Sequence, residues 1–281
     1  MDNRQKVLDV RALEIEIVSE RGRMKAVQHL SFGIETGQVL GIVGESGCGK
    51  SMTCMSILGL LPDSAHVTRG SIRLNGIELT GLSSKKLMQI RRHQLSLVLQ
   101  NPMTAFNPLK TIGSQFVETL RLKSNCSKKQ AFELATQRLA EMNLPEPDRV
   151  LSQYPFELSG GMLQRIMIGL ATANNPTLLI ADEPTTALDN GNREHVLNAI
   201  RRIKAKGGTA MLLVSHDLSV IEAVADTVIV MKKGQIVESG LTKDVIRHPQ
   251  AEYTKLLCDS RLTWSNPNQD RSQERVEIVQ V

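Results

Sequence analysis

The sequence predicts an α/β domain whose core is a parallel β-sheet covered by helices on both faces. Two apolar runs, Thr177–Ala181 and Thr209–Val214, flank the amphipathic segment Arg193–Lys206. Continuous apolar strands in strand–helix–strand order are typical of parallel sheets, because both faces of such strands are buried. A third apolar run, Gln38–Val43, ends in a glycine-rich segment from which a helix begins at Lys50.

Strands dominate the prediction for the N-terminal part of the chain. The helix from Lys50 has apolar residues for one buried face, and we expect it to end at Pro62, because proline cannot continue a helix. Further short strands are predicted at Val7–Ile17, Leu30–Ile34, Ser71–Leu74 and Leu95–Leu99.

The middle of the chain is predicted to be helical. The segment Asn101–Leu109 contains two prolines and should form an irregular loop at the surface. Thr111–Leu144 has a mainly helical pattern, with Ser127 as the N-cap of a helix that runs to Glu141. Gly160–Ala173 has a further helical pattern.

The chain is predicted to close with a strand pair and a polar tail. The strands Val228–Met231 and Gln235–Glu238 are joined by a Lys-Lys-Gly turn. After Cys258 the sequence is polar and is expected to be disordered. We therefore predict one folded domain over residues 1–258 and a disordered tail over residues 259–281.

Composition excludes several classes of protein. No apolar run approaches the roughly 20 residues that span a bilayer, and MDNRQKVLDV lacks the apolar core of a signal peptide, so a cytoplasmic chain is expected. The 34 Lys+Arg against 29 Asp+Glu give +5, but this excess is scattered and only 3% of residues are aromatic, so nucleic acid is not an expected partner. The four cysteines form no CxxC pair, so neither disulfides nor a zinc site is expected.

A phosphate-binding pattern, GxxxxGK followed by Ser or Thr, comes directly after Val43. Its residues are Gly44, Glu45, Ser46, Gly47, Cys48, Gly49, Lys50 and Ser51. Between a strand and a helix, such a loop directs backbone N–H groups and the helix N-terminus at phosphates. Lys50 would reach the β- and γ-phosphates, Ser51 would ligate Mg²⁺, and Met52 extends the binding segment. The same positive field is expected to lower the thiol pKa of Cys48 and make it reactive.

A second element places carboxylates beside this loop. The apolar run from Leu178 ends in Asp182 and Glu183, and the carboxyl ends of parallel strands meet at one edge of the sheet. Asp182 would orient Mg²⁺ through its water shell, and Glu183 is the candidate general base for an attacking water. An acidic strand end alone is common at solvated positions, so its meaning depends on the neighbouring motifs.

A serine and two glycines open a later helix. Ser159, Gly160 and Gly161 form a second anion site at a helix N-terminus. Because this element lies between the phosphate-binding loop and the acidic strand, the sequence resembles the ATP-binding subunits of ABC transporters over about residues 5–258. The resemblance implies a P-loop NTPase of ABC type, with a RecA-like parallel sheet, an antiparallel β subdomain and a helical subdomain inserted at about residues 101–174.

The resemblance also implies roles for single residues and two ligands, ATP and Mg²⁺. Gln100 matches the glutamine that senses the γ-phosphate and the metal, and His216 matches the switch histidine that contacts the γ-phosphate. Asp189 ends the segment that communicates across a dimer and is counted with the nucleotide-binding residues. The implied catalytic residues are Lys50, Gln100, Glu183 and His216, and the implied metal ligands are Ser51, Gln100 and Asp182.

One departure from the family concerns the nucleotide base. The family usually stacks adenine on an aromatic residue ahead of the phosphate loop, but residues 1–31 contain no Phe, Tyr or Trp. Met24, Arg23 and Val27 are the candidates to cover the base instead.

Shorter resemblances indicate the type of transporter. Gln100–Leu109 and His248–Tyr253 are similar to the ATPases of dipeptide, oligopeptide and nickel importers, whereas Tyr154–Arg165 and Met52–Cys54 are closer to those of nickel importers. Nickel, free or chelated, is the favoured substrate, and dipeptides or oligopeptides are the alternative. The implied partners are two integral membrane permeases, a second and related ATPase subunit and an extracytoplasmic solute-binding protein, assembled at the cytoplasmic face of the inner membrane.

Two other functional classes fit the sequence less well. A soluble ABC-type ATPase that acts on DNA or ribosomes usually joins two nucleotide domains or carries long coiled-coil insertions, but this chain has one phosphate loop and no sustained heptads. A P-loop kinase for small molecules would lack the Ser159–Gly161 element.

Overall fold

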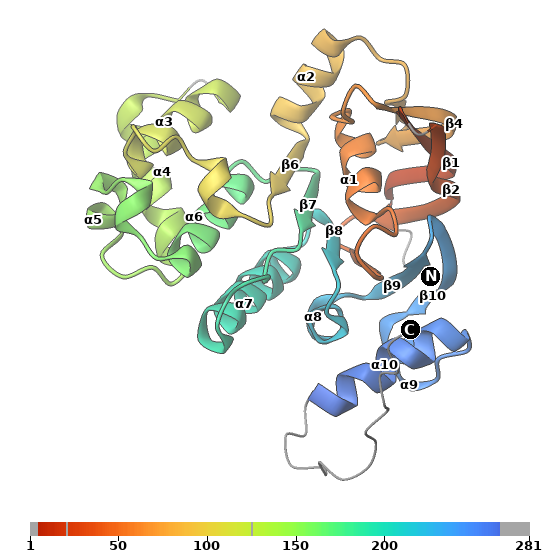
Figure 1. Cartoon of the computed structure of the whole chain (residues 1–281). Coiled ribbons are helices and arrows are strands. Elements are labelled where there is room, and N and C mark those ends of the chain that lie inside the picture. The colour runs from red at the N-terminus through yellow and green to blue at the C-terminus, as the bar shows by residue number, and fades with distance from the viewer. Residues whose placement is uncertain (1–4, 21, 125, 265–281) are drawn as a thin grey trace.

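The computed structural model describes residues 5–20, 22–124 and 126–264, which form two β-sheets and a lobe of helices (Figure 1). The larger sheet has six strands in the order β10–β9–β3–β8–β7–β6. Neighbouring strands are parallel from β9 to β6, whereas β10 pairs with β9 in the antiparallel direction. These strands are β3 (Val39–Val43), β6 (Leu95–Val98), β7 (Leu178–Asp182), β8 (Ala210–Ser215), β9 (Thr227–Lys232) and β10 (Gln235–Leu241).

The second sheet is antiparallel and has four strands in the order β2–β1–β4–β5. Helix α1 (Lys50–Leu58) packs between the two sheets, and its buried Cys54 and Ile57 join apolar side chains from both in one core cluster. The strands of this sheet are β1 (Lys6–Ser19), β2 (Gly22–Glu35), β4 (Ala65–Leu74) and β5 (Ile77–Glu78).

Successive side chains along each core strand point to opposite faces of the larger sheet, so neighbouring residues pack against different helices. In β8, Leu212 belongs to the cluster that contains α1, whereas Leu213 belongs to the cluster formed with helices of the opposite face. On that opposite face, a Cβ at Gly41 of β3 would lie only 2.6 Å from Ile221 Cγ2, so the absence of a side chain lets α8 (Leu218–Val224) approach the strand closely. The prediction of a parallel sheet buried on both faces is confirmed.

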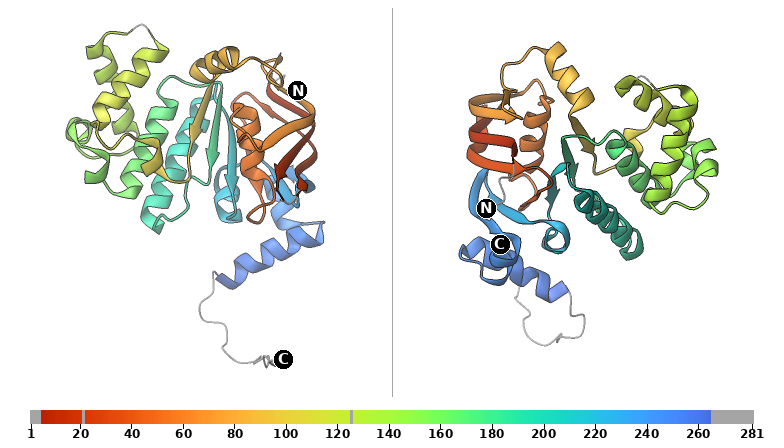
Figure 2. Two further views of the ribbon diagram at one scale, coloured as in Figure 1. Left: turned by 45° about the horizontal axis from the view of Figure 1, so that its top comes forward. Right: turned by 180° about the vertical axis from the view of Figure 1, so that it is seen from behind.

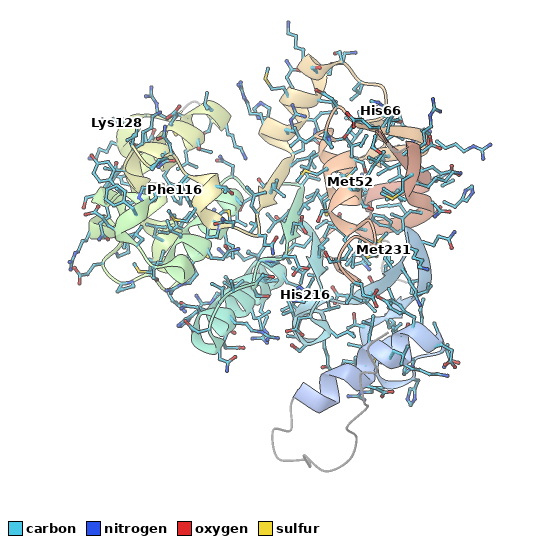
Figure 3. The ribbon with its side chains drawn as sticks, viewed as in Figure 1. Met52, His66, Phe116, Lys128, His216 and Met231 are labelled. Atoms are coloured by element: carbon cyan, nitrogen blue, oxygen red, sulfur yellow. The ribbon has the colours of Figure 1, made fainter. Side chains whose placement is uncertain are left out.

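A helical lobe connects β6 to β7 and stands beside the sheets in Figures 1 and 2. The predicted N-cap of its second long helix is confirmed, since Ser127 Oγ accepts from Gln130 N at 3.2 Å and Gln130 Oε1 accepts from Ser127 N at 2.9 Å. Phe116, labelled in Figure 3, is fully buried in this lobe. Its elements are η1 (Pro102–Ala105), α3 (Ile112–Lys123), α4 (Lys128–Glu141), α5 (Pro147–Ser152), η2 (Pro155–Glu157) and α6 (Gly160–Thr172).

Further helices lie outside the helical lobe. Helices α9 and α10 follow β10 and project from the end of the molecule remote from the helical lobe (Figure 2). No helix within the described part of the chain combines the length and the apolar character needed to cross a membrane. The helices are α2 (Ser84–His93), α7 (Asn190–Lys206), α9 (Thr242–Arg247) and α10 (Glu252–Trp264).

Two helix boundaries differ from those predicted. Helix α1 ends at Leu58 rather than at Pro62, because Gly59 adopts a left-handed φ of 62° and Leu60 N then donates to Met55 O at 2.8 Å. Helix α10 runs to Trp264, so its last residues extend into the segment expected to be a disordered tail. Residues 265–281 of that tail lie outside the described residues.

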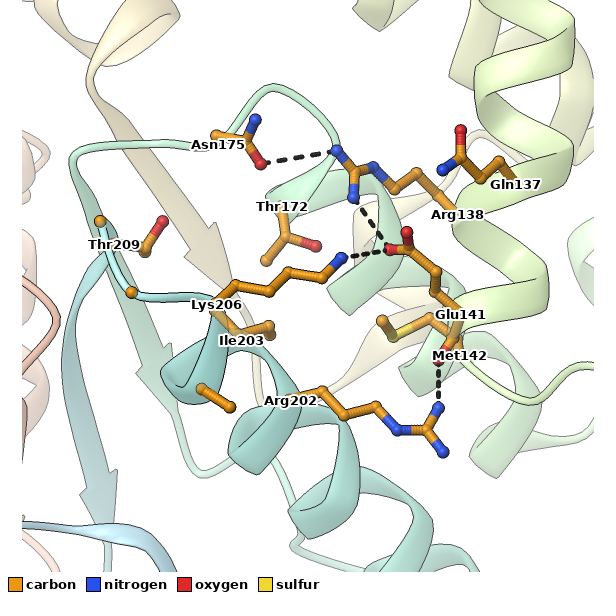
Figure 4. A pocket seen from close by; sticks show the side chains of 13 residues that line it. Gln137, Arg138, Glu141, Met142, Thr172, Asn175, Arg202, Ile203, Lys206 and Thr209 are labelled. Carbon is orange, nitrogen blue, oxygen red and sulfur yellow. Dashed lines mark hydrogen bonds and ion pairs between the residues drawn. The ribbon is translucent and has the colours of Figure 1, made fainter.

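An ionic network joins the helical lobe to the core beside a cavity of about 890 Å³ (Figure 4). Glu141 of α4 accepts hydrogen bonds from Arg138 Nη1 and from Lys206 Nζ of α7, each at 2.9 Å. Arg202 Nη1, also on α7, donates to Glu141 O at 2.6 Å. Burial alone would raise the pKa of Glu141, but the hydrogen bonds from Lys206 and Arg138 outweigh it and lower that pKa.

The substitution Glu141→Gln is expected to lower the free energy of unfolding by about 1 kcal/mol, the net value of a partly buried charged network. For a chain of this size that corresponds to a fall in melting temperature of about 2–4 °C. Because the folded-state pKa lies below the unfolded value, the contribution is fully present above about pH 4.3 and is lost as the pH falls through the lowered value.

Melting curves of wild type and variant at pH 7 and pH 3.5 check this prediction. Glu133→Gln is the matched control, because Glu133 is 62% exposed and lies 4.0 Å from a similarly exposed Lys129. A destabilisation by Glu141→Gln no larger than that of the control at pH 7 contradicts the role of the network.

Candidate nucleotide site

The loop between β3 and α1 fits its surroundings only because it contains glycine. Gly44 has a φ of 159°, and a Cβ there would lie 2.2 Å from Met231 O of β9. Gly49 has a φ of 103°, and a Cβ there would lie 2.5 Å from Ala26 O of β2. The loop is therefore wedged between the two sheets. Gly49 also provides no side-chain cap for α1, which leaves the first N–H groups of this helix for a ligand.

The side chain of Lys50 is buried and folds back on the loop. Its Nζ donates to Gly44 O at 2.6 Å and to Glu45 O at 2.9 Å. A buried ammonium group requires such partners. Phosphate oxygens could replace the two carbonyls, since a hydrogen bond between two charged groups is stronger than one to a neutral acceptor.

The structure corrects the prediction for Cys48. Its side chain is only 5% exposed, and burial raises the pKa of the thiol against the opposing effect of Lys50. The loop's positive field is therefore too weak to offset desolvation. Cys48 is a protonated and shielded thiol at neutral pH, so it lacks both conditions for the expected reactivity.

Asp182 at the end of β7 has the properties of a metal ligand. Burial raises its pKa, an effect that a hydrogen bond with Ser51 opposes. Its Oδ1 is buried and has no hydrogen-bond partner among the described residues. This oxygen and the Ser51 hydroxyl are hard donors that suit Mg²⁺. No group of three or more His, Cys, Asp or Glu within the described ranges could hold a metal, so phosphate and water would have to complete the shell.

Glu183 and His216 are brought together at the ends of neighbouring strands. His216 Nδ1 lies 2.8 Å from Glu183 Oε2, which also accepts a hydrogen bond from Thr186 Oγ1 at 3.0 Å. Glu183 has a φ of 52°, a left-handed conformation that is strained for a residue with a side chain. The surrounding bonds hold it there, including one from Glu183 N to Val214 O at 2.9 Å. Strain of this kind is concentrated at functional positions.

A cavity of about 370 Å³ collects most of the predicted site residues. Figure 3 shows Met52 on α1 and His216 after β8, two of the residues that line it. The phosphate-binding loop, Gln100 after β6 and the Glu183–His216 pair therefore face one space. The lining residues are Ile17, Met24, Ala26, Ser46, Gly47, Gly49, Lys50, Ser51, Met52, Gln100, Glu183 and His216.

The β1–β2 hairpin supplies the apolar wall of this cavity. Met24 is 61% exposed and lies opposite Ile17 in the register of the two strands, and both residues line the cavity. Val27 is fully buried and, like Arg23, is absent from the lining. Of the three residues suggested to cover a base, only Met24 lies at the cavity. The sequence missed Ile17, because only the strand register places it beside Met24.

The second predicted anion site lies apart from this cavity. Ser159 Oγ accepts from Met162 N at 3.3 Å and caps α6, but no residue of Ser159–Gly161 lines the cavity. A Cβ at Gly161 would lie 2.2 Å from Asn192 Cγ. Asp189, which is also outside the cavity, caps α7 by accepting from Asn192 N at 2.8 Å. Hydrogen bonds from Asn192 lower the pKa of Asp189. Asn192 therefore packs the start of α6 against the start of α7.

Tyr253 of α10 was not singled out as a site residue, yet it reaches the loop. Its Oη accepts from Glu45 N at 3.0 Å. Tyr253 lies 208 residues after Glu45 in the sequence, so no local pattern predicts this contact.

Comparisons with known proteins agree on one family. The sequence model described as ABC transporter matches residues 27–186. The chain is 43% identical over 251 residues to the Escherichia coli protein named "Probable D,D-dipeptide transport ATP-binding protein DdpD", covering 89% of this chain and 76% of that protein. It is 43% identical over 257 residues to the dipeptide transport ATP-binding protein DppD of Bacillus subtilis, covering 91% and 77%.

Two further similarities extend this result. The metal-staphylopine import system ATP-binding protein CntD of Staphylococcus aureus is 43% identical over 235 residues, covering 84% of this chain and 86% of that protein. Among solved structures, the ATP-binding cassette MJ0796, a dimer in a post-hydrolysis state with ADP and Pi, superposes with a TM-score of 0.75. It is 26% identical, and the match covers 84% of this chain and 98% of that one.

We expect Glu183→Gln to lower ATP hydrolysis by about 10²-fold or more, the range of a positioned general base, because the amide cannot accept a proton from water. ATP binding should persist, since the loop and Lys50 remain intact. Steady-state hydrolysis and equilibrium binding of a fluorescent ATP analogue measure the two effects separately.

Glu194→Gln on α7 makes the same chemical change at a glutamate whose side chain is 56% exposed and pairs with Arg201. This control should retain wild-type hydrolysis. Undiminished hydrolysis by Glu183→Gln would show that another group serves as the base.

Proposed function

The chain belongs to the ABC transporter family, and on this premise we propose that it is the ATPase subunit of an importer whose cargo is dipeptides or short oligopeptides. The observation that carries the proposal is its 43% identity to two dipeptide-transport ATP-binding proteins over 89% and 91% of its length. The oligopeptide transport ATP-binding protein OppD of Escherichia coli, 39% identical over 248 residues, supports the same class of cargo. This replaces nickel, which the sequence favoured, as the main interpretation.

We assign the hydrolytic roles from the cavity geometry. The loop and Lys50 would bind the phosphates, and Glu183 would accept the proton of the attacking water. His216, whose Nδ1 lies 2.8 Å from Glu183 Oε2, would contact the terminal phosphate. Mg²⁺ held by Ser51, Asp182 and Gln100 would neutralise phosphate charge when bound.

We further propose that hydrolysis requires two ATPase subunits. The Ser159–Gly161 site is exposed at Ser159 and Gly160 but contributes nothing to the cavity of its own chain. The N-terminus of α6, with its positive helix dipole, would serve the phosphates bound to a second chain. The dimeric state of the structural neighbour MJ0796 supports this arrangement. The second subunit would be a related chain, as the family resemblance implies.

The remaining partners would be two membrane permeases and an extracytoplasmic solute-binding protein, with this subunit at the cytoplasmic face of the membrane. A groove of about 300 Å³ between α1 and the helical lobe supports docking of a permease helix, because Leu60, Phe106 and Met167 line it. On the loop that follows Gln100, Met103 is 46% and Leu109 is 85% exposed. Exposed apolar side chains around an apolar groove are typical of an interaction surface.

A metal chelate is the second candidate cargo. The specific observation is the similarity to the metal-staphylopine import protein, of which this chain covers 86%, a larger share than for the dipeptide-transport proteins. Chelated nickel would belong to this class. The ATP-hydrolysing site is compatible with either cargo, since the cargo does not contact the ATPase.

Gly160→Glu tests the shared site. A Cβ at Gly160 meets no atom within 4 Å, and an acidic residue in the first turn of α6 suits the helix dipole, so the monomer should fold and bind ATP normally. The added carboxylate should repel the phosphates bound to a second chain, so hydrolysis should fall by at least about 10²-fold. Nucleotide binding, hydrolysis and sedimentation of the ATP-bound protein measure these effects.

Gly160→Ala provides the control, because it adds a methyl group without charge. It should retain most of the hydrolysis and the ATP-dependent association. Wild-type hydrolysis by Gly160→Glu, or hydrolysis that stays proportional to protein concentration at high dilution, contradicts the shared site.

Deletion of the gene distinguishes the two cargoes. We expect the deletion strain to resist toxic di- and tripeptides while taking up radioactive nickel, free or chelated, as the parent does. Wild-type protein should restore sensitivity, whereas the Glu183→Gln variant should not. Lost nickel uptake with unchanged peptide sensitivity would replace the peptide assignment by the metal-chelate one.

A further inference from the structure

The outer side of the phosphate-binding loop is held by the C-terminal part of the chain. Tyr253 Oη accepts from Glu45 N at 3.0 Å, and Gly234 N in the β9–β10 turn donates to Cys48 O at 3.0 Å. Tyr253 and Gly234 both lie outside residues 27–186, the part matched by the family model, whereas Glu45 and Cys48 lie inside it. The loop is therefore held in part by residues that follow the segment matched by the family model.

The phenol of Tyr253 is itself fixed in place. Its side chain is 6% exposed, and Lys232 Nζ lies 4.5 Å from the ring centroid. The start of α10 is anchored by Glu238 of β10, whose Oε1 and Oε2 accept from Gln250 N at 2.9 Å and Ala251 N at 3.0 Å. The position of α10 therefore determines where Tyr253 Oη accepts the hydrogen bond from Glu45 N.

The peptide groups of Glu45 are held from two sides. On the inner side, Lys50 Nζ donates to Glu45 O at 2.9 Å and to Gly44 O at 2.6 Å. When Lys50 turns to phosphate, these bonds are lost. The bond from Glu45 N to Tyr253 joins two residues that do not line the cavity, so it can persist. Tyr253 does not line the cavity, so it acts on the loop and not on the nucleotide.

We infer that Tyr253 is a positioning residue that keeps the phosphate-binding loop in its ATP-binding conformation, so that docking of α10 sets the affinity for ATP. Without the phenolic oxygen, Glu45 N–H loses its partner and the loop populates conformations that do not bind phosphate. The apparent Kd then rises in inverse proportion to the fraction of competent loop. The inference rests on the proposed ATPase function and adds a control of nucleotide affinity by the C-terminal helix.

Tyr253→Phe removes the acceptor oxygen and keeps the ring beneath Lys232. We expect the Kd for a fluorescent ATP analogue to rise about fivefold, as for loss of one hydrogen bond, with a matching rise in KM. The kcat at saturating ATP should change by less than about twofold, because the catalytic groups stay in place once the nucleotide is bound. Hydrogen exchange at the Glu45 amide should become faster.

Two companion variants separate positioning from folding. Tyr154→Phe changes the other tyrosine of the chain, which is 38% exposed and stacks on Phe156, and should leave the Kd unchanged. Glu238→Gln weakens the anchor of α10 and should raise the Kd in the same direction as Tyr253→Phe.

The results have distinct consequences. A Kd for Tyr253→Phe equal to that of wild type overturns the inference, and so does a change in kcat with an unchanged Kd. A raised Kd with an unchanged hydrogen-exchange rate at the Glu45 amide also overturns it. Failure of the wild-type chain to bind ATP would overturn the proposed function together with this inference. If the wild-type chain binds ATP and Tyr253→Phe binds it with the same Kd, this inference alone is overturned.

Discussion

Parallel pairing of β9, β3, β8, β7 and β6 is the constraint on which the site depends. In this register Val43 pairs with Ser215, Asp182 with Val214, and Val98 with Ala181, so four strands end together. The ends of these strands and the segments that follow them carry the phosphate-binding loop, His216, the acidic pair and Gln100. The backbone ladders therefore assemble the cavity from segments that are distant in sequence, and side-chain contacts only refine it.

Two of the three charged groups at the site have partners within the chain. Lys50 bonds to carbonyls of the loop, and Glu183 is paired with His216 and Thr186. Asp182 differs, because its Oδ1 is buried without a hydrogen-bond partner among the described residues. Phosphate and metal binding would therefore exchange existing hydrogen bonds at Lys50 and Glu183. At Asp182, binding would supply a partner that Oδ1 lacks. The hydrogen bonds of Lys50 and Glu183 within the chain explain how this buried cluster of charges is stable.

The helical lobe and the core meet beside Gln100. Gln164 of α6 is buried and donates to Leu99 O at 3.4 Å, one residue before Gln100. At the other end of the interface, Lys206 and Arg202 of α7 bond to Glu141. Because Ser159 caps the N-terminus of α6, movement of the lobe would shift the proposed anion site and the backbone before Gln100 together. The lobe thus connects the two halves of the proposed shared site.

The sequence by itself determined the parallel core, the phosphate-binding loop, the acidic strand end and the cap at Ser127, because each is a local pattern of apolar period, glycine or capping residue. It did not reveal helices α2, α8, α9 and α10. Of these, α8 and α9 have only seven and six residues, too few for a helical period to show. It also misjudged Cys48, since desolvation depends on neighbours from other segments. Only the tertiary structure decided that Ile17 faces Met24, that Glu183 meets His216, and that Tyr253 holds Glu45. Those contacts depend on strand register and on packing between residues far apart in the chain, which no local pattern encodes.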